Sequence, residues 1–267
     1  MKEDKDVKSK FIDEVLALEF EKRVPIWLLM IVVTIIFTSL GLLSGNYIHP
    51  FFLIIFSSAP IYPLYLSQFK VQQYGKAIKL TFVWAITISV IIILFTLGYS
   101  SLASKAVVLG SSYQEDMFNW IATGIGSEGT PSIFIPENLI NATVFTTFSL
   151  ASAGFLALLF GAYQMNYMNF YVGMLLSRVI NPTPNNFVMV FLLSWPIYAI
   201  IRVVGFIFIG VATTIPLSSK IFNKDINSRI IIKFFLVGTI LVGMDIVIKT
   251  LVAPFYRELL QELVNVA

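Results

Sequence analysis

The sequence predicts an all-α protein, a polytopic helical transmembrane bundle of about seven spans. Hydrophobic residues make up 57% of the 267 residues and charged residues only 12%. The apolar runs reach about 20 residues, the length that crosses a hydrocarbon core roughly 30 Å thick. Runs such as 24–43 and 80–98 are apolar on all sides, whereas a surface helix of a soluble protein keeps a polar face. These observations exclude a soluble fold.

The apolar runs place the individual spans at 24–43, 51–67, 80–98, 142–161, 163–180, 187–215 and 230–252. The fifth run is short and polar at its start, so six crossings are the alternative. With seven, the N-terminus and the lysine-rich stretches 70–79 and 220–233 lie on one side, as the positive-inside rule requires. We therefore expect seven crossings of the cell membrane, with a cytoplasmic N-terminus and an external C-terminus.

The same assignment divides the chain into five parts. Residues 1–23 mix acidic and basic side chains with an apolar residue every fourth position, which predicts a cytoplasmic amphipathic segment. Residues 24–98 hold the first three transmembrane helices, 99–141 form an external cap loop, 142–256 hold the remaining spans, and 257–267 are an external tail. The net charge of +3 follows from this topology, so no nucleic-acid partner is expected.

Charged residues inside the spans are the first candidate site. Arg202 lies about midway along its span, and Asp245 and Lys249 interrupt the apolar stretch "GTILVGMDIVIKTLVAP" one helical turn apart. An arginine at the centre of a span costs about 2.5–3.5 kcal/mol on insertion scales, so such residues face the bundle interior and are paired. We expect Arg202, Asp245 and Lys249 to form a cluster that joins the sixth and seventh spans. A proton or ion pathway is the alternative.

Two further groups of residues have the spacing of helix contacts. Small side chains four residues apart predict a helix-packing seam within the protein, with a seam between copies or a pore lining as the alternatives: Ser149, Ala153, Ala157 and Gly161. Three amides follow, which either satisfy backbone groups at a tight turn or line a polar cavity: Gln164, Asn166 and Asn169.

The composition argues against an enzyme. There is no cysteine and one histidine, which excludes thiolate and multi-histidine metal sites. Asp245 is the single carboxylate inside the predicted spans, so an intramembrane pair of acids is excluded as well. The acids of the cap, Glu115, Asp116, Glu128 and Glu137, could in principle pair for acid–base work, but nothing in their spacing distinguishes them from the acids of a solvated loop. We expect no catalytic residue, metal ion or cofactor.

One order of features runs through residues 136–256. It begins with "ENLINATVF" before the small-residue helix "ASAGFLALLFG" and continues through "NYMNFYVGMLL" and "LLSWPIYAIIRVVGFIFIG" to a last helix closing on "IKTLVAP". In this order the segment resembles the stage II sporulation protein M family of membrane proteins. The family's Pro-His-Gly motif and its following glutamate are replaced by "SWPIYA", and a second family glutamate falls on Lys249. The resemblance implies a divergent, non-enzymatic membrane component.

The sequence as a whole thus predicts a subunit or scaffold of a larger membrane complex, with membrane lipids and other membrane-protein subunits or further copies of itself as partners. The alternative is a small-solute or ion permease built around Arg202 and Asp245. A polar cavity that reaches Arg202 would favour the permease, and a dry interlocked cluster would favour the scaffold.

Overall fold

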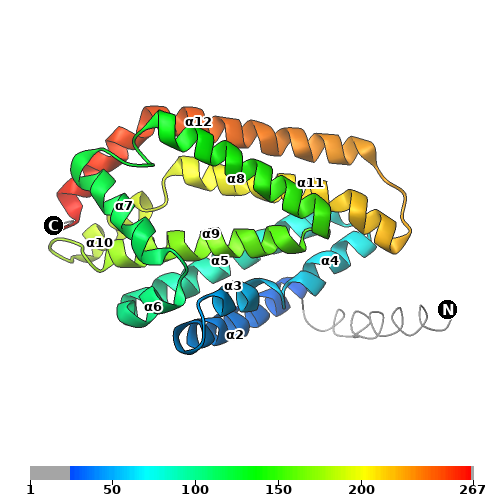
Figure 1. Cartoon of the computed structure of the whole chain (residues 1–267), viewed down its shortest axis with the longest axis horizontal. Helices are drawn as coiled ribbons and strands as arrows, with labels where there is room; N and C mark the ends of the chain where they lie inside the picture. The colour runs from blue at the N-terminus through cyan, green and yellow to red at the C-terminus, as the bar shows by residue number, and fades with distance from the viewer. Residues whose placement is uncertain (1–24, 266–267) are drawn as a thin grey trace.

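The computed structural model describes residues 25–265, and this part of the chain is almost entirely α-helical (Figure 1). The predicted amphipathic segment 1–23 lies outside the described residues. Within them no strand forms, and one isolated β-bridge joins Val179 to Val264. The prediction of an all-α fold is confirmed.

The helices of the described part are, in chain order, α2 (Ile26–Tyr47), α3 (Phe51–Ser58), α4 (Tyr62–Lys70), α5 (Tyr74–Gly98), α6 (Ser100–Ala106), α7 (Gly110–Thr123), α8 (Pro131–Ser152), α9 (Phe155–Leu176), α10 (Pro184–Leu193), α11 (Ile197–Phe222) and α12 (Ser228–Leu263).

Five helical segments of the described part are long and apolar enough to cross a membrane: Ile26–Tyr47, Phe51–Lys70, Tyr74–Gly98, Ile197–Phe222 and Ser228–Leu263. They make the chain a multi-pass membrane protein. Helices α8 and α9, with 22 residues each, are long enough but more polar, and they are not among the five.

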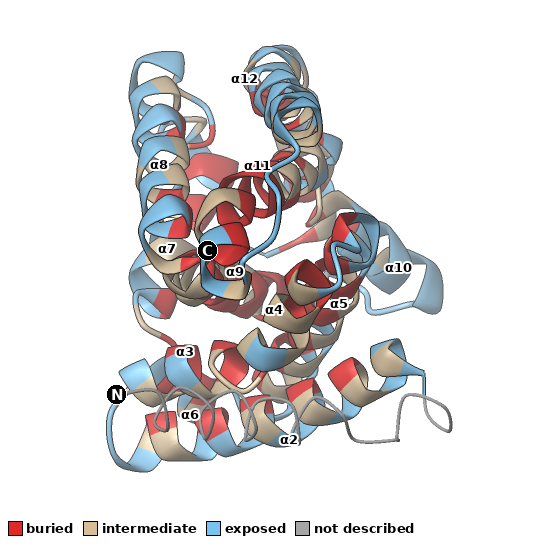
Figure 2. Cartoon of the chain, turned by 90° about the vertical axis from the view of Figure 1, so that its right-hand side faces the viewer, coloured by how far each residue is buried: buried red, intermediate tan, exposed pale blue. Residues whose placement is uncertain are grey.

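The long helices run along the long axis of the molecule, so that its connections gather at two ends (Figure 1). Helices α6, α7, α10 and the C-terminus lie at one end, which we call the cap end, and the loop between α11 and α12 lies at the other. Helix α9 contacts α3, α5, α7 and α8, and Figure 2 shows it in the interior with α11. Polar side chains of α9 are therefore shielded from lipid by other helices.

The structure corrects the predicted fourth span, 142–161. The chain turns at Ala153 and Gly154, whose φ angles of 51° and 89° end α8 and start α9. A Cβ at Gly154 would lie 2.5 Å from Thr214 Oγ1, so glycine permits both the turn and the close approach of α11. Helix α8 begins at Pro131, inside the predicted cap.

Two more predicted boundaries are corrected. The span 187–215 consists of two helices, because Pro196 has no backbone N–H to continue α10 into α11. The tail 257–267 is helical as far as Leu263. Its end pairs with the segment after α9, since Ile180 N donates to Leu263 O at 2.8 Å and Asn265 N donates to Arg178 O at 3.0 Å.

Candidate functional site

Four charged side chains meet where α11 and α12 approach the loop before α8: Arg202, Asp245, Lys249 and Glu128. Arg202 has 13% of its side chain exposed and Asp245 none, while Lys249 and Glu128 have 2% and 9% exposed. Two of the four groups are basic and two are acidic, so the net charge of the cluster is zero when all four are ionised.

Arg202 and Asp245 are connected through Asn138 of α8. Arg202 Nη1 donates to Asn138 Oδ1 at 2.9 Å, and Asn138 Nδ2 donates to Asp245 Oδ2 at 3.1 Å. The direct separation between Arg202 Nη1 and Asp245 Oδ2 is 3.8 Å. This is too long for a hydrogen bond, so the amide relays the contact and adds α8 to the predicted tie between α11 and α12.

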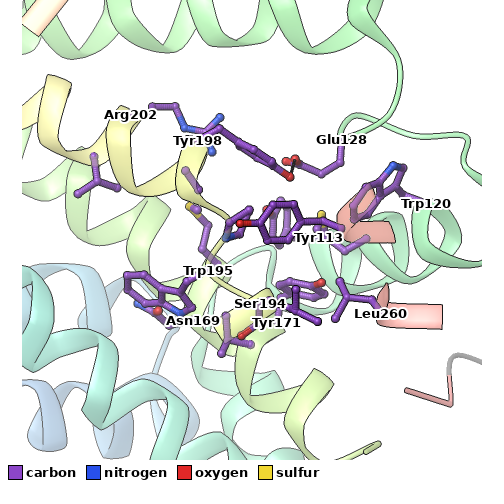
Figure 3. Close-up of a pocket in the computed structure, with 18 of the residues that line it drawn as sticks. Tyr113, Trp120, Glu128, Asn169, Tyr171, Ser194, Trp195, Tyr198, Arg202 and Leu260 are labelled. Atoms are coloured by element: carbon purple, nitrogen blue, oxygen red, sulfur yellow. Dashed lines mark hydrogen bonds between the residues drawn. The ribbon is translucent and has the colours of Figure 1, made fainter. Parts of the chain in front are cut away.

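Lys249 has an ion-pair partner that the sequence analysis did not assign to it. Its ammonium lies 3.0 Å from Glu128 Oε2 and 4.4 Å from the centre of the Phe134 ring. The Tyr198 hydroxyl also donates to Glu128 Oε2, at 3.1 Å. Figure 3 shows Tyr198 and Arg202 of α11 beside Glu128. The carboxylate of Glu128 is thus held by α11 and α12 together.

The loop 124–130 directs Glu128 inward because it folds tightly against the end of α7. A Cβ at Gly129 would lie 2.5 Å from Gly124 O and 2.7 Å from the indole nitrogen of Trp120, so only glycine fits there. Arg257 of α12 holds the end of α7, donating from Nε to Trp120 O at 3.1 Å and Ile121 O at 3.0 Å. A cation at the C-terminus of a helix also complements its dipole.

The ionisation of Glu128 reflects two opposing effects. Burial raises the pKa of the Glu128 carboxyl, but the Lys249 ammonium and the Arg202 guanidinium outweigh it, so its pKa lies below the ordinary value. The charge of Glu128 in turn acts on the phenol of Tyr113 in α7. Burial and the nearby Glu128 charge raise the pKa of Tyr113 well above 10.0. The carboxylate is therefore ionised and the phenol neutral around pH 7.

A polar cavity borders Arg202 and is lined in part by residues of the cap end. It offers about 70 Å³ to the centres of water molecules, where about 10–15 Å³ suffices for one. Its lining comes from α7, α8, α9, α11, α12 and the loop before α8: Tyr113, Ser127, Glu128, Glu137, Asn138, Asn141, Gln164, Tyr167, Met168, Arg202, Phe206 and Lys249. The side-chain polar groups of Asn141, Gln164 and Tyr167 have no hydrogen-bond partner within residues 25–265. Hydrogen-bonding groups therefore converge on a space that holds no protein atoms.

A second, mostly apolar cleft extends from Arg202 toward the turn between α8 and α9. Its lining includes Trp84, Phe145, Gly154 and Gly161, and it shares Gln164 and Arg202 with the polar cavity. A third cavity beside the break between α10 and α11 also borders Arg202 (Figure 3). Arg202 is thus the charged residue at which the cavities meet.

The predicted packing seam does not lie on one helix. Ser149 lies on α8 and donates to Gly210 O of α11 at 3.0 Å, and Ala153 forms the turn. Ala157 and Gly161 belong to α9, and Gly161 faces Trp84, 3.6 Å from the position of an added Cβ. The four residues therefore serve different contacts within the chain.

The predicted polar turn lies within α9 instead of at its start. Asn169 Nδ2 donates to Ser89 Oγ of α5 at 3.0 Å. Asn166 is buried, and neither polar atom of its amide has a partner among the described residues. Gln164 borders the polar cavity and the apolar cleft at Arg202, and Asn169 lines the third cavity beside Arg202. Of the three amides, Gln164 is the one on the wall of the polar cavity.

Sequence reasoning missed two residues of the site, Glu128 and Asn138. For Glu128, the count of charged residues within the predicted spans was an available signal. The predicted spans contain two bases and one acid in their interior, so one base requires an acid from outside them. Glu128 stands between glycines in "GSEGT", a composition that forms tight loops. For Asn138 no such signal exists, because its helix was expected to begin at residue 142.

The fold and the site together define a multi-pass helical membrane protein with a charged, partly hollow centre. Comparisons with protein-family models, curated proteins and solved structures found no match to this chain.

Proposed function

We propose that this chain is a non-enzymatic membrane carrier, a permease that binds a small anionic solute at Arg202. The observation that carries the proposal is the polar cavity that borders Arg202. A purely structural charge cluster has no need of a polar cavity beside it. A solute carrier needs one, because its ligand must exchange water for protein groups.

The donors of Arg202 favour an anion as the solute. Within the described residues, Nη1 is the one guanidinium nitrogen of Arg202 with a hydrogen-bond partner. The remaining N–H groups match the two oxygens of a carboxylate, sulfonate or phosphate group. Gln164 and Tyr167 on the cavity wall add neutral hydrogen-bonding groups for the same ligand.

Seven crossings are part of the proposal. Helices α8 and α9 are each about 33 Å long at 1.5 Å per residue, enough for a hydrocarbon core of roughly 30 Å. Their polarity comes from residues such as Asn138 and Gln164, which face the site instead of lipid. We place the N-terminus in the cytoplasm and the cap end outside the cell.

The breaks in the helices are consistent with transport. The chain is interrupted between α10 and α11 at Ser194 to Pro196, and these residues line the cavity next to Arg202. Carriers commonly place discontinuous helices at their binding sites, because the ends of half-helices and the unwound backbone between them bind substrate and ions.

Uptake into proteoliposomes tests the function. Vesicles containing the purified protein are exposed to radiolabelled methanesulfonate, which does not cross the lipid as a neutral acid. Arg202→Gln is compared with Arg229→Gln, an exposed arginine at the far end of the bundle. We expect uptake above protein-free vesicles for wild type and Arg229→Gln and its loss in Arg202→Gln. Equal uptake by all three proteins would contradict a site at Arg202.

A subunit or scaffold of a larger membrane complex is the second candidate, in line with the resemblance to the stage II sporulation protein M family. The contacts of the cap favour it, since Glu128 and Arg257 fasten the cap loop and α7 to α12. A firmly held external surface suits a docking role. Mild-detergent extraction from the native membrane tests it: a stoichiometric protein partner supports the scaffold, and a lone protein or homo-oligomer supports the carrier.

A further inference from the structure

The charge balance of the site restricts how an anion can bind. Arg202 and Lys249 carry two positive charges, and Asp245 and Glu128 carry two negative charges, all in a largely buried position. An added anion leaves one negative charge without compensation. An unpaired charge in a low-dielectric interior is strongly unfavourable, so the site requires a cation to enter together with the anion.

Asp245 has the free position that a proton requires. Its Oδ2 accepts from Asn138 and lies near Arg202, whereas its Oδ1 is buried and has no hydrogen-bond partner among residues 25–265. Glu128 differs from Asp245 because its Oε2 lies 3.0 Å from the Lys249 ammonium and also accepts a hydrogen bond from the Tyr198 hydroxyl. Of the two buried acids, Asp245 is the one whose charge can be removed without breaking a close ion pair.

We propose that the anion is bound together with one proton, which Asp245 holds as a neutral carboxylic acid while Arg202 turns its charge to the anion. This inference rests on the proposed function. In the empty state the Asp245 carboxylate balances Arg202. When the anion arrives, one proton from water is added to Asp245, and the total charge of the site returns to zero. The ligand class is a small anion, and the coupling ion is H⁺.

The surroundings of Asp245 fit this exchange. The charged groups that act on it are Arg202 from α11, Lys249 from its own helix and Glu128 from the loop before α8. From α8 it meets the neutral amide of Asn138, which borders the polar cavity. The acid of α8 that lines the same cavity, Glu137, is exposed. Asn138 therefore stands between the buried carboxyl group and the polar cavity.

Calorimetry with the purified full-length protein tests the coupling. Acetate and methanesulfonate are titrated in two buffers of different ionisation enthalpy, which measures the protons taken up per anion bound. Methanesulfonate is the decisive probe because, as the anion of a strong acid, it carries no proton itself. We expect about one proton per anion in wild type above the pKa of Asp245, with affinity falling about tenfold per pH unit.

Asp245→Asn mimics the protonated acid, and we expect it to bind the anion with no proton uptake and with equal affinity at pH 6 and pH 8. Glu262→Gln, an exposed acid on the same helix, serves as the control and should behave as wild type. Binding without proton uptake in wild type, or unchanged uptake in Asp245→Asn, overturns the coupling while the anion site stands. If neither anion binds to any variant, the proposed function fails and the coupling with it. The wild-type result decides the question even where Asp245→Asn does not fold.

Discussion

Lys249 Nζ lies 3.0 Å from Glu128 Oε2, and this buried ion pair connects the last membrane-spanning helix to a loop outside every predicted span. The contact holds the cap loop against the bundle. Because Lys249 pairs with Glu128, Asp245 has Arg202 as its counter-ion. The two acids therefore differ in how tightly they are held. Glu128 has a close permanent partner, whereas Asp245 is held through an amide at one oxygen.

Removal of the lysine should cost more stability than removal of the whole pair. Lys249→Met leaves Glu128 buried without its partner, and we expect a loss of about 3–5 kcal/mol in the free energy of unfolding. The double variant Lys249→Met with Glu128→Gln removes both charges and should recover most of that loss. Unfolding in mild detergent measures both variants. Equal stability of the single and double variants would show that the ion pair is not formed.

Acidification should weaken the attachment of the cap. Because the pKa of Glu128 in the folded protein lies below the ordinary value of 4.5, its ion pair stabilises the fold above about pH 4.5, and that contribution is lost as the pH falls through the lower folded value. Thermal unfolding midpoints between pH 7 and pH 3 should therefore fall more in wild type than in Glu128→Gln. Identical pH profiles of the two proteins would show that the ion pair of Glu128 does not contribute to stability.

Arg202 should behave as the counter-ion of Asp245. Arg202→Met leaves the Asp245 carboxylate without a cation and should lower the unfolding midpoint. Adding Asp245→Asn should restore part of it, because the orphaned charge is then gone. A double-mutant cycle on the unfolding free energy gives the coupling between the two residues. Strictly additive effects would mean that the contact through Asn138 contributes nothing.

The turn between α8 and α9 should depend on glycine. Gly154 has φ +89° and no room for a Cβ beside Thr214, so Gly154→Ala should destabilise the protein by at least about 1–2 kcal/mol. Gly243 in the middle of α12 has no atom within 4 Å of an added Cβ. Gly243→Ala should stabilise by about 0.5–1 kcal/mol. If both variants raise the free energy of unfolding, or both lower it, the claim that the turn requires glycine at position 154 is contradicted.

The sequence predicted the helical class and most of the long helices, because lipid-facing runs such as Ile26–Tyr47 and Tyr74–Gly98 are apolar throughout. It misplaced α8 and α9, because the sequence is apolar or small on both sides of the turn at Ala153 and Gly154 and no charged residue marks the break. Shielded helices tolerate polar residues that a lipid-facing helix does not, so hydropathy underestimates helices in the centre of a bundle.

The candidate site was predictable in part. Intramembrane charge identified Arg202, Asp245 and Lys249, because the cost of isolated charges in lipid requires that they be paired. Glu128 and Asn138 come from a loop and from the start of a helix whose positions depend on tertiary packing. Local sequence patterns contain no information on such contacts. The one exception is the excess of basic over acidic residues within the predicted spans, which required an acid from outside them.

The accessibility of the polar cavity tests the central claim most directly. The chain has no cysteine, so single cysteines can be introduced and treated with an anionic methanethiosulfonate reagent in reconstituted vesicles. Gln164→Cys is the probe in the cavity, and Asn166→Cys is its buried control on the same helix. A carrier site at Arg202 predicts rapid labelling at position 164, slowed by Arg202→Gln, and no labelling at position 166. If position 164 is as unreactive as position 166, the cluster is dry and the proposed carrier function is wrong.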